Sequence, residues 1–266
     1  MPLHVEVRGS GPPLVVLHGF TQTGRLFGRF GDHLSESHTL VAVDLPGHAG
    51  SDAVRTGLAE TAELVSQSVL SVVGEGPCAL LGYSLGARVA LHVVTGTDLA
   101  VRRAVLIGAT GGIEDPAERN RRRLSDEALA DELEASGDVE RFLDQWLGGP
   151  MFARLSSLEA DDRAERGRNT ATGLASSLRL CGTGTQEPLW DRLPSLASPL
   201  LAMAGADDTR FAAHALRIAD LAPQAVVSLV PGGGHAVHLS QPEQAWRIVD
   251  HWLGTAEPAL IGAIRS

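Results

Sequence analysis

The chain has 266 residues, of which 44% are hydrophobic and 20% are charged, and its formal net charge at pH 7 is −10. This composition is typical of a globular enzyme, with either one substantial domain carrying an insertion or two small domains. The negative net charge argues against nucleic-acid binding, which requires a basic surface. The sequence contains 22 arginines and no lysine. Schiff-base chemistry on a lysine and a phosphate or cofactor held by a lysine are therefore excluded.

Other function classes are disfavoured by patterns that the sequence lacks. No apolar run reaches the roughly 18 to 20 residues that span a bilayer, and the start, "MPLHVEVRGSGPPLVVLHGF", lacks the basic-then-apolar pattern of a signal peptide. We therefore expect no membrane span and a cytoplasmic protein. Cys78 and Cys181 are far apart and form no CxxC pair, so we expect two buried thiols rather than zinc ligands or a disulfide.

The predicted elements alternate between strand and helix. The N-terminal segment predicts a short strand, a turn and a second strand. Runs of Val, Leu, Ile and Ala follow, mostly without polar alternation, as is typical of strands buried on both faces of a parallel sheet. The sequence predicts strands at 14–19, 39–47, 78–84, 103–109, 199–205 and 225–232, and helices at 58–74, 85–96 and 241–254. This order predicts an α/β fold with a mostly parallel sheet flanked by helices.

One long segment interrupts the alternation. Residues 111–190 show no strand pattern, and their acidic residues and arginines recur at helical spacing beside an apolar face. We expect this segment to form a helical cap inserted into a core made of residues 1–110 and 191–266. A cap of this kind would cover the carboxyl ends of the strands, where α/β sheets bind their ligands.

The stretch "GYSLGAR" at 82–88 closes a predicted strand and opens a predicted helix. A GxSxG pattern in that position is typical of a nucleophile elbow, in which a sharp turn exposes the serine. Gly82 and Gly86 would leave room for the strained backbone of Ser84. We interpret Ser84 as the reactive residue, while an inert serine in a glycine-rich turn stays open as the alternative.

A reactive serine needs a base and a carboxylate that orients the base. In this kind of sheet the chain order is serine, acid, histidine. "GADDTRF" offers Asp207 or Asp208, and "PGGGHAVHL" offers His235 or His238, each after a predicted strand. We favour Asp208 and His235, since the glycines before His235 let its loop approach the elbow.

Two backbone N–H groups are the predicted donors to a developing oxyanion. Leu85 begins the helix after the elbow, where the helix dipole favours negative charge. Phe20 lies in the "HGF" loop after the first buried strand, and we expect the adjacent His18 to be structural. The sequence shows no metal-ligand cluster and no dinucleotide fingerprint, so we expect neither a metal nor a cofactor.

The motifs "HGF", "DLPGH", "GYSLG", "GADD" and "GGGHAVH" together resemble the α/β-hydrolase superfamily over essentially the whole chain. A narrower set is more specific, because generic esterases do not share its cap motifs. "GYSLGAR", "ERNRRRLSD", "FLDQWLGGPMF", "RNTATGLASSLR", "GTGTQEPLW" and "GGGHAVHLSQPE" resemble the 2-succinyl-6-hydroxy-2,4-cyclohexadiene-1-carboxylate synthases of menaquinone biosynthesis. The implied fold is an α/β-hydrolase fold with an inserted helical cap.

This narrower resemblance implies a lyase that removes a proton from a small polycarboxylate and expels pyruvate. The implied substrate, 2-succinyl-5-enolpyruvyl-6-hydroxy-3-cyclohexene-1-carboxylate, carries three carboxylates, which arginine recognises with matching fork geometry. The residues that the resemblance implies are the catalytic Ser84, Asp208 and His235, the carboxylate-binding Arg88, Arg122 and Arg168, and the pocket-lining Tyr83, Trp146 and Phe152. We expect a monomer or a small homo-oligomer.

Two other readings stay open, because a fold does not fix a function. An esterase or C–C hydrolase with the same triad would form an acyl-enzyme. A non-catalytic relative would bind a ligand or partner without turning it over.

Overall fold

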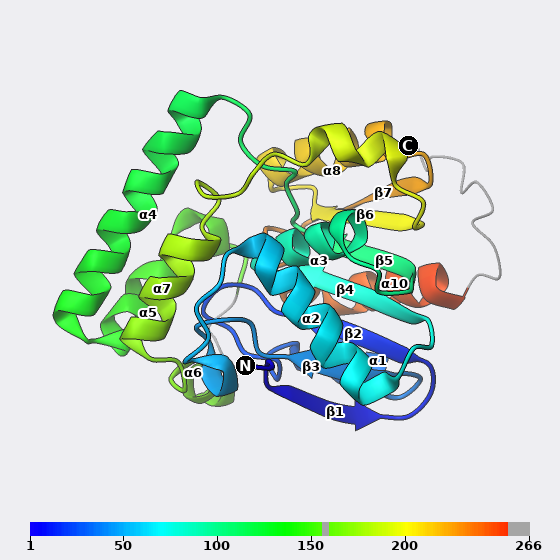
Figure 1. Ribbon diagram of the computed structural model, residues 1–266, viewed down its shortest axis with the longest axis horizontal. Helices are drawn as coiled ribbons and strands as arrows, with labels where there is room; N and C mark the ends of the chain where they lie inside the picture. Colours follow the sequence, from blue (N-terminus) through cyan, green and yellow to red (C-terminus); the bar gives the residue numbers. More distant parts are fainter. Residues whose placement is uncertain (156–159, 255–266) are drawn as a thin grey trace.

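The computed structural model describes residues 1–155 and 160–254, which contain one seven-stranded sheet of order β1-β3-β2-β4-β5-β6-β7 (Figure 1). β1 runs antiparallel to β3, and every other neighbouring pair is parallel. The expected α/β fold with a mostly parallel sheet is confirmed. The strands are β1 (Val5–Gly9), β2 (Pro13–Leu17), β3 (Thr39–Val43), β4 (Cys78–Tyr83), β5 (Val101–Ile107), β6 (Leu200–Gly205) and β7 (Ala225–Val230).

Helices cover both faces of the sheet, which explains why the strand sequences lack polar alternation. In β2, Val15 and Leu17 join the apolar core on one face, whereas Leu14 and Val16 join the core on the other. The helices on the first face are α2 (Leu58–Val73), α3 (Leu85–Gly96) and α8 (Thr209–Leu221). Those on the second are α1 (Gly28–Ser35), α9 (Val237–Ser240) and α10 (Pro242–Gly254).

The predicted segments coincide with observed elements, and the differences lie at their ends. β3 ends at Val43, short of the predicted end at 47. Pro46 has no N–H to donate to a neighbouring strand, and Gly47 has a φ of 78°, so the chain turns away there. β5 begins at Val101, earlier than predicted, because an irregularity in its pairing with β4 lets Val101 pair with Cys78.

Among the described residues between β5 and β6 there are four α-helices: α4 (Pro116–Ser136), α5 (Val139–Leu147), α6 (Ala160–Arg166) and α7 (Ala171–Cys181). A short 3-10 turn, η2 (Pro150–Phe152), follows α5. Asp115 caps α4 through its side chain, and Pro116 occupies the first turn, where its missing N–H costs nothing. These helices gather on one side of the sheet (Figure 1). The cap boundaries at 111 and 190 stay a prediction.

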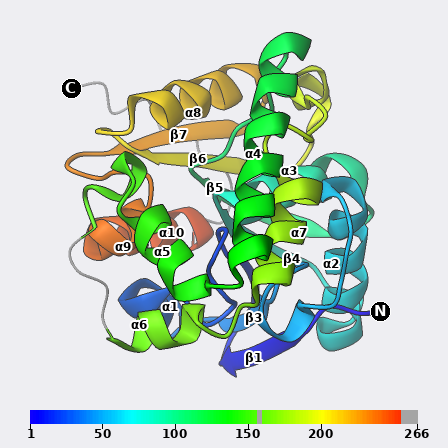
Figure 2. The same ribbon diagram turned by 90° about the vertical axis from the view of Figure 1, so that its left-hand side faces the viewer.

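Ion pairs join the two longest of these helices. In Figure 2, α4 and α7 run side by side in front of the strands. Arg179 of α7 lies 2.7 Å from Glu127 and 2.6 Å from Asp131, both on α4.

Within the described ranges, no helix is both long enough and apolar enough to cross a bilayer. Cys78 and Cys181 are buried free thiols, as expected.

Candidate active site

Ser84 sits in the sharp turn between β4 and α3, with φ 51° and ψ −106°. Positive φ is rare for a residue with a side chain, so the surrounding structure must hold this turn. A Cβ at Gly82 would collide with the carbonyl oxygen of Gly86, and a Cβ at Gly86 would collide with that of Leu17. Only glycine fits at these two positions, and the turn presents the Ser84 hydroxyl above the carboxyl end of β4.

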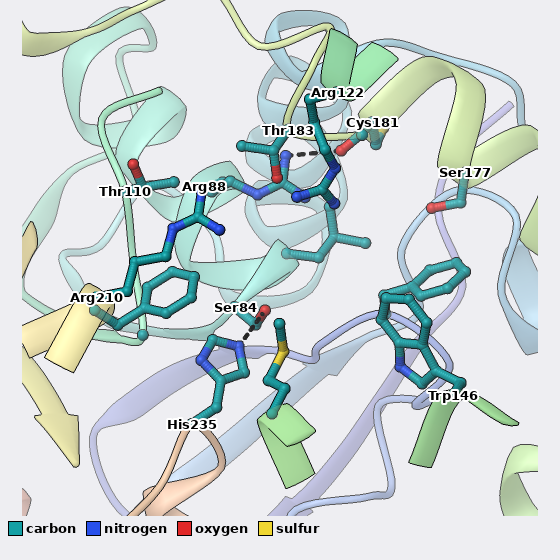
Figure 3. A pocket seen from close by; sticks show the side chains of 16 residues that line it. Ser84, Arg88, Thr110, Arg122, Trp146, Ser177, Cys181, Thr183, Arg210 and His235 are labelled. Carbon is teal, nitrogen blue, oxygen red and sulfur yellow. Dashed lines mark hydrogen bonds between the residues drawn. The ribbon is translucent and has the colours of Figure 1, made fainter. Parts of the chain in front are cut away.

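His235 and Asp208 extend from Ser84 in a hydrogen-bonded chain. The Nε2 atom of His235 lies 2.9 Å from Ser84 Oγ, and its Nδ1 atom lies 3.1 Å from Asp208 Oδ2 (Figure 3). Burial alone would raise the pKa of Asp208, but hydrogen bonds from His235 and from the Phe211 amide outweigh it and lower that pKa. Asp208 is thus an anion positioned to orient the imidazole and to stabilise it when protonated.

A close approach of two loops brings these residues together. Gly205, at the end of β6, packs so tightly on Gly233 that a Cβ there would collide with the Gly233 carbonyl. The Asp207 amide also donates to that carbonyl at 3.1 Å. The ring of Phe211 lies 4.3 Å from the His235 ring, centroid to centroid, and supports it from the first turn of α8.

The alternative acid and base lie elsewhere. Asp207 faces Arg154, with 2.7 Å between Oδ2 and Nη2. His238 is fully buried beside the rings of Phe27 and Tyr83, and burial lowers its pKa to about 3. Neither residue contacts Ser84.

Two backbone N–H groups near Ser84 have no protein acceptor within the described ranges: those of Phe20 and Leu85. Leu85 is the first residue of α3, where the helix dipole concentrates partial positive charge. Around Phe20, the adjacent Thr21 has a φ of 67° and donates its N–H to His48 at 3.3 Å. His18 is fully buried and accepts the Leu45 N–H at 3.0 Å, a structural role.

A pocket opens over Ser84 between the strand ends and the cap helices. Within the described residues, its lining contains three arginines and His235 and no acidic side chain. The guanidinium groups of Arg88, Arg122 and Arg210 all point into it (Figure 3). The other lining residues are Phe20, Ser84, Leu85, Gly108, Thr110, Trp146, Met151, Ser177, Cys181, Gly182, Thr183 and Phe211.

Arg88 is the most enclosed of these arginines. Its side chain is buried in α3, and Nη1 donates to the carbonyl oxygen of Cys181 at 2.7 Å. Burial, with a smaller contribution from the charge of Arg122, lowers its pKa to about 10. Arg88 therefore remains a cation at neutral pH, although no carboxylate within the described ranges pairs with it.

Arg122 reaches the pocket from α4. Its Nε donates to Asp126 Oδ1 at 2.8 Å, one helical turn along, which fixes the guanidinium against the cap. Two buried polar atoms of the lining, Trp146 Nε1 and Ser177 Oγ, have no hydrogen-bond partner within the described ranges. Buried donors are rarely left unpaired, so this pocket suits a ligand with oxygen acceptors.

The structure places Arg168 away from the other two predicted carboxylate-binding arginines. Its side chain is exposed, pairs with Glu165 and is not among the residues that line the pocket. The buried arginine of that segment is Arg166, whose Nη1 donates to Thr21 Oγ1 at 2.6 Å. The turn between α6 and α7 directs the two side chains apart, and the motif "RNTATG" alone does not reveal this direction.

The expected aromatic residues take different places. Trp146 lines the pocket and packs edge-on against Phe20, with 5.1 Å between ring centroids. Tyr83 is buried beneath the site, 5.4 Å from the His235 ring, and does not line the pocket. Phe152 lies behind the lining, with its ring 6.4 Å from His235.

Sequence reasoning missed four polar lining residues: Thr110, Ser177, Thr183 and Arg210. The sequence did contain an indication for Arg210, because it lies two positions after the predicted acid Asp208 in "GADDTRF" and so must lie near the site.

The fold and the residues around Ser84 define an enzyme of the α/β-hydrolase class, and residues 14–247 match the sequence model of the alpha/beta hydrolase family. A Serratia proteamaculans (strain 568) protein named 2-succinyl-6-hydroxy-2,4-cyclohexadiene-1-carboxylate synthase is 31% identical over 87% of this chain and 89% of its own length. The chain belongs to the alpha/beta hydrolase family and, within it, to the family of these synthases.

Two further relatives agree with this assignment. A Bacillus subtilis (strain 168) protein, provisionally given the same synthase name, is 32% identical over 93% of this chain and 92% of its own length. Among solved structures, MenH from S. aureus superposes with a TM-score of 0.87 at 27% identity, covering 94% of this chain and 98% of that one.

Proposed function

We propose that this enzyme eliminates pyruvate from 2-succinyl-5-enolpyruvyl-6-hydroxy-3-cyclohexene-1-carboxylate, giving 2-succinyl-6-hydroxy-2,4-cyclohexadiene-1-carboxylate in menaquinone biosynthesis. The observation that carries the proposal is the cationic pocket over Ser84, into which Arg88, Arg122 and Arg210 point. In a chain of net charge −10, such a local cluster favours a ligand with several carboxylates. The names of the relatives support the same reaction.

In the proposed mechanism, Ser84 is the base that removes the proton. The imidazole of His235, oriented by Asp208, accepts the hydroxyl proton as Ser84 Oγ takes a proton from the substrate ring carbon. The electron pair of the broken C–H bond passes into the substrate and then breaks the bond between the ring and the enolpyruvyl oxygen. That group leaves as the enolate of pyruvate, which takes up one proton, and the His235 imidazolium gives up the proton that it accepted, so the enzyme returns to its starting state.

The N–H groups of Phe20 and Leu85 are the proposed donors to the oxygen on which negative charge develops. No acyl-enzyme forms and no water is consumed. The cap residues that line the pocket, Trp146 and Ser177 among them, would keep the reacting atoms away from bulk water.

The experiment supplies the substrate with the enzyme of the preceding step and follows pyruvate release, comparing the wild type with Ser84→Ala. We expect the wild type to release pyruvate and the variant to lose well over 90% of kcat, which is more than about 1.4 kcal/mol of the barrier. A variant that keeps a tenth or more of wild-type kcat would remove Ser84 from the role of base.

The same experiment separates the two other functions. An acyl-enzyme burst on aryl esters, without pyruvate release, would instead establish an esterase. Tight binding of the substrate without turnover would establish a binding protein. The cytoplasmic location and the monomer or small homo-oligomer stay predictions.

A further inference from the structure

Arg210 enters the pocket from the core of the enzyme rather than from the cap. It occupies the first turn of α8, two residues after Asp208. Its guanidinium carbon lies 5.9 Å from the ring centroid of Phe211, the residue that packs against His235. The residue is exposed, and its side chain points into the pocket that lies over Ser84 (Figure 3).

Arg210 forms no ion pair in the described part of the chain. Its two nearest acids in sequence are already engaged: Asp207 by Arg154 and Asp208 by His235. Arg247 is also exposed and forms no ion pair within the described ranges, but Arg210 differs from it in lining the pocket. Arg210 therefore offers its N–H donors to whatever occupies the pocket.

The three pocket arginines come from different elements. Arg88 belongs to α3, Arg122 to α4 and Arg210 to α8. Arg88 and Arg122 lie close enough for the charge of one to lower the pKa of the other, whereas Arg210 approaches from the side of His235 (Figure 3). A ligand in the pocket can therefore meet Arg210 as well as the neighbouring pair Arg88 and Arg122.

We propose that Arg210 is a specificity-determining residue that binds one carboxylate of the substrate, on the His235 side of the pocket. The inference rests on the proposed function, which supplies a substrate with three carboxylates. Two of them then face Arg88 and Arg122, and the third is held by the planar fork of Arg210.

The test compares Arg210→Gln with Arg210→Lys and with a matched control, Arg247→Gln, at an exposed position of α10 outside the pocket. For the tricarboxylate, we expect Arg210→Gln to lower kcat/KM about 10-fold, mainly through KM. Arg210→Lys should recover part of the loss, since it keeps the charge without the fork. Arg247→Gln should match the wild type.

A neutral aryl acetate distinguishes recognition from an indirect effect. Arg210 lies near enough to Asp208 to contribute to the low pKa of that carboxyl group. If Arg210 acted only through Asp208, hydrolysis of the neutral ester would fall in parallel and its pH profile would shift. We expect the ester activity and its pH profile to stay unchanged in Arg210→Gln, and a parallel loss would overturn the inference.

Inhibition by succinate and by pyruvate identifies the carboxylate that Arg210 holds. We expect the inhibition constant of one of them to rise about 10-fold in Arg210→Gln. Unchanged constants for both, together with an unchanged kcat/KM, would refute the assignment of Arg210. Failure of the proposed function itself would look different, because the wild type would then release no pyruvate at all.

Discussion

The carboxylate of Asp207 lies 2.7 Å from the guanidinium of Arg154, which follows η2 on the cap side of the molecule. Asp208, the next residue, instead faces His235 at 3.1 Å. Two adjacent acids thus hold different parts of the structure: one joins the core to the segment after η2, and the other belongs to the site around Ser84.

Replacement of these two acids by asparagine should have very different effects. Asp208→Asn keeps the shape of the side chain but removes the charge that orients and stabilises the His235 imidazole. We expect kcat for pyruvate release to fall on the order of 10³- to 10⁴-fold. Asp207→Asn removes a partly exposed ion pair, worth about 1 kcal/mol or less, and kcat should stay within about fivefold of the wild type. Similar losses in both variants would contradict the assignment of Asp208.

The pocket arginines should discriminate between charged and neutral substrates. A charge-assisted hydrogen bond contributes about 1.5–3 kcal/mol. Arg88→Met and Arg122→Met should therefore each lower kcat/KM for the tricarboxylate by roughly 10- to 150-fold. Aryl acetate hydrolysis needs no carboxylate recognition and should be nearly unchanged, with thermal unfolding as the control for folding. Equal losses on both substrates would assign these arginines to the fold instead.

Arg168→Met tests whether Arg168 binds the substrate, as the family resemblance implies, or takes no part in binding, as its position outside the pocket indicates. Its side chain is largely exposed, pairs with Glu165 and lies outside the pocket. We expect its kcat/KM for the tricarboxylate to stay within about threefold of the wild type, as is usual for an exposed ion pair. A loss as large as that of Arg88→Met would show that Arg168 reaches the substrate.

Buried histidines should make the enzyme sensitive to acid. Burial lowers the pKa of His238 to about 3, whereas the unfolded chain titrates near 6.5. Between these values the unfolded state binds the additional proton, so the free energy of unfolding falls as the pH falls. The contribution of His238 is about 1.4 kcal/mol per pH unit, or about 2 kcal/mol between pH 7 and pH 5.

His238→Leu should remove this contribution. Urea unfolding at pH 7 and at pH 5 gives the decrease in the free energy of unfolding between these two pH values. This decrease should be about 2 kcal/mol smaller in His238→Leu than in the wild type. At pH 8 the histidine is neutral in both the folded and the unfolded state. The difference in the free energy of unfolding between wild type and variant at that pH therefore measures the effect of repacking alone. An unchanged pH dependence would mean that His238 is protonated in the folded protein.

Pyruvate release should not depend on a metal. Within the described ranges, no group of three or more His, Cys, Asp or Glu residues is arranged to hold a metal ion. The proposed chemistry needs only the triad, the backbone donors and the arginines. Treatment with a chelator followed by dialysis should therefore leave kcat unchanged. Activity that returns only when a divalent cation is added back would refute the proposed mechanism.

Much of the architecture follows from local patterns in the sequence. The apolar runs locate β2 to β7. In the inner strands of the sheet the runs lack polar alternation because both faces are covered, whereas the edge strand β7 keeps partly exposed apolar residues. The glycines around Ser84 predict the elbow, because the backbone there excludes a Cβ. The chain order of serine, acid and histidine reduces the candidate partners of Ser84 to two acids and two histidines. These properties depend on neighbours in sequence, so the sequence by itself determined them.

The tertiary structure decided the positions of side chains for which the sequence indicated a preference at most. It places Asp208 beside His235 and Asp207 beside Arg154. The cap turns Arg166 inward and Arg168 outward, and α8 brings Arg210 to the pocket. Each outcome depends on where segments distant in sequence meet, because the direction of a side chain is set by packing against them and not by its own motif.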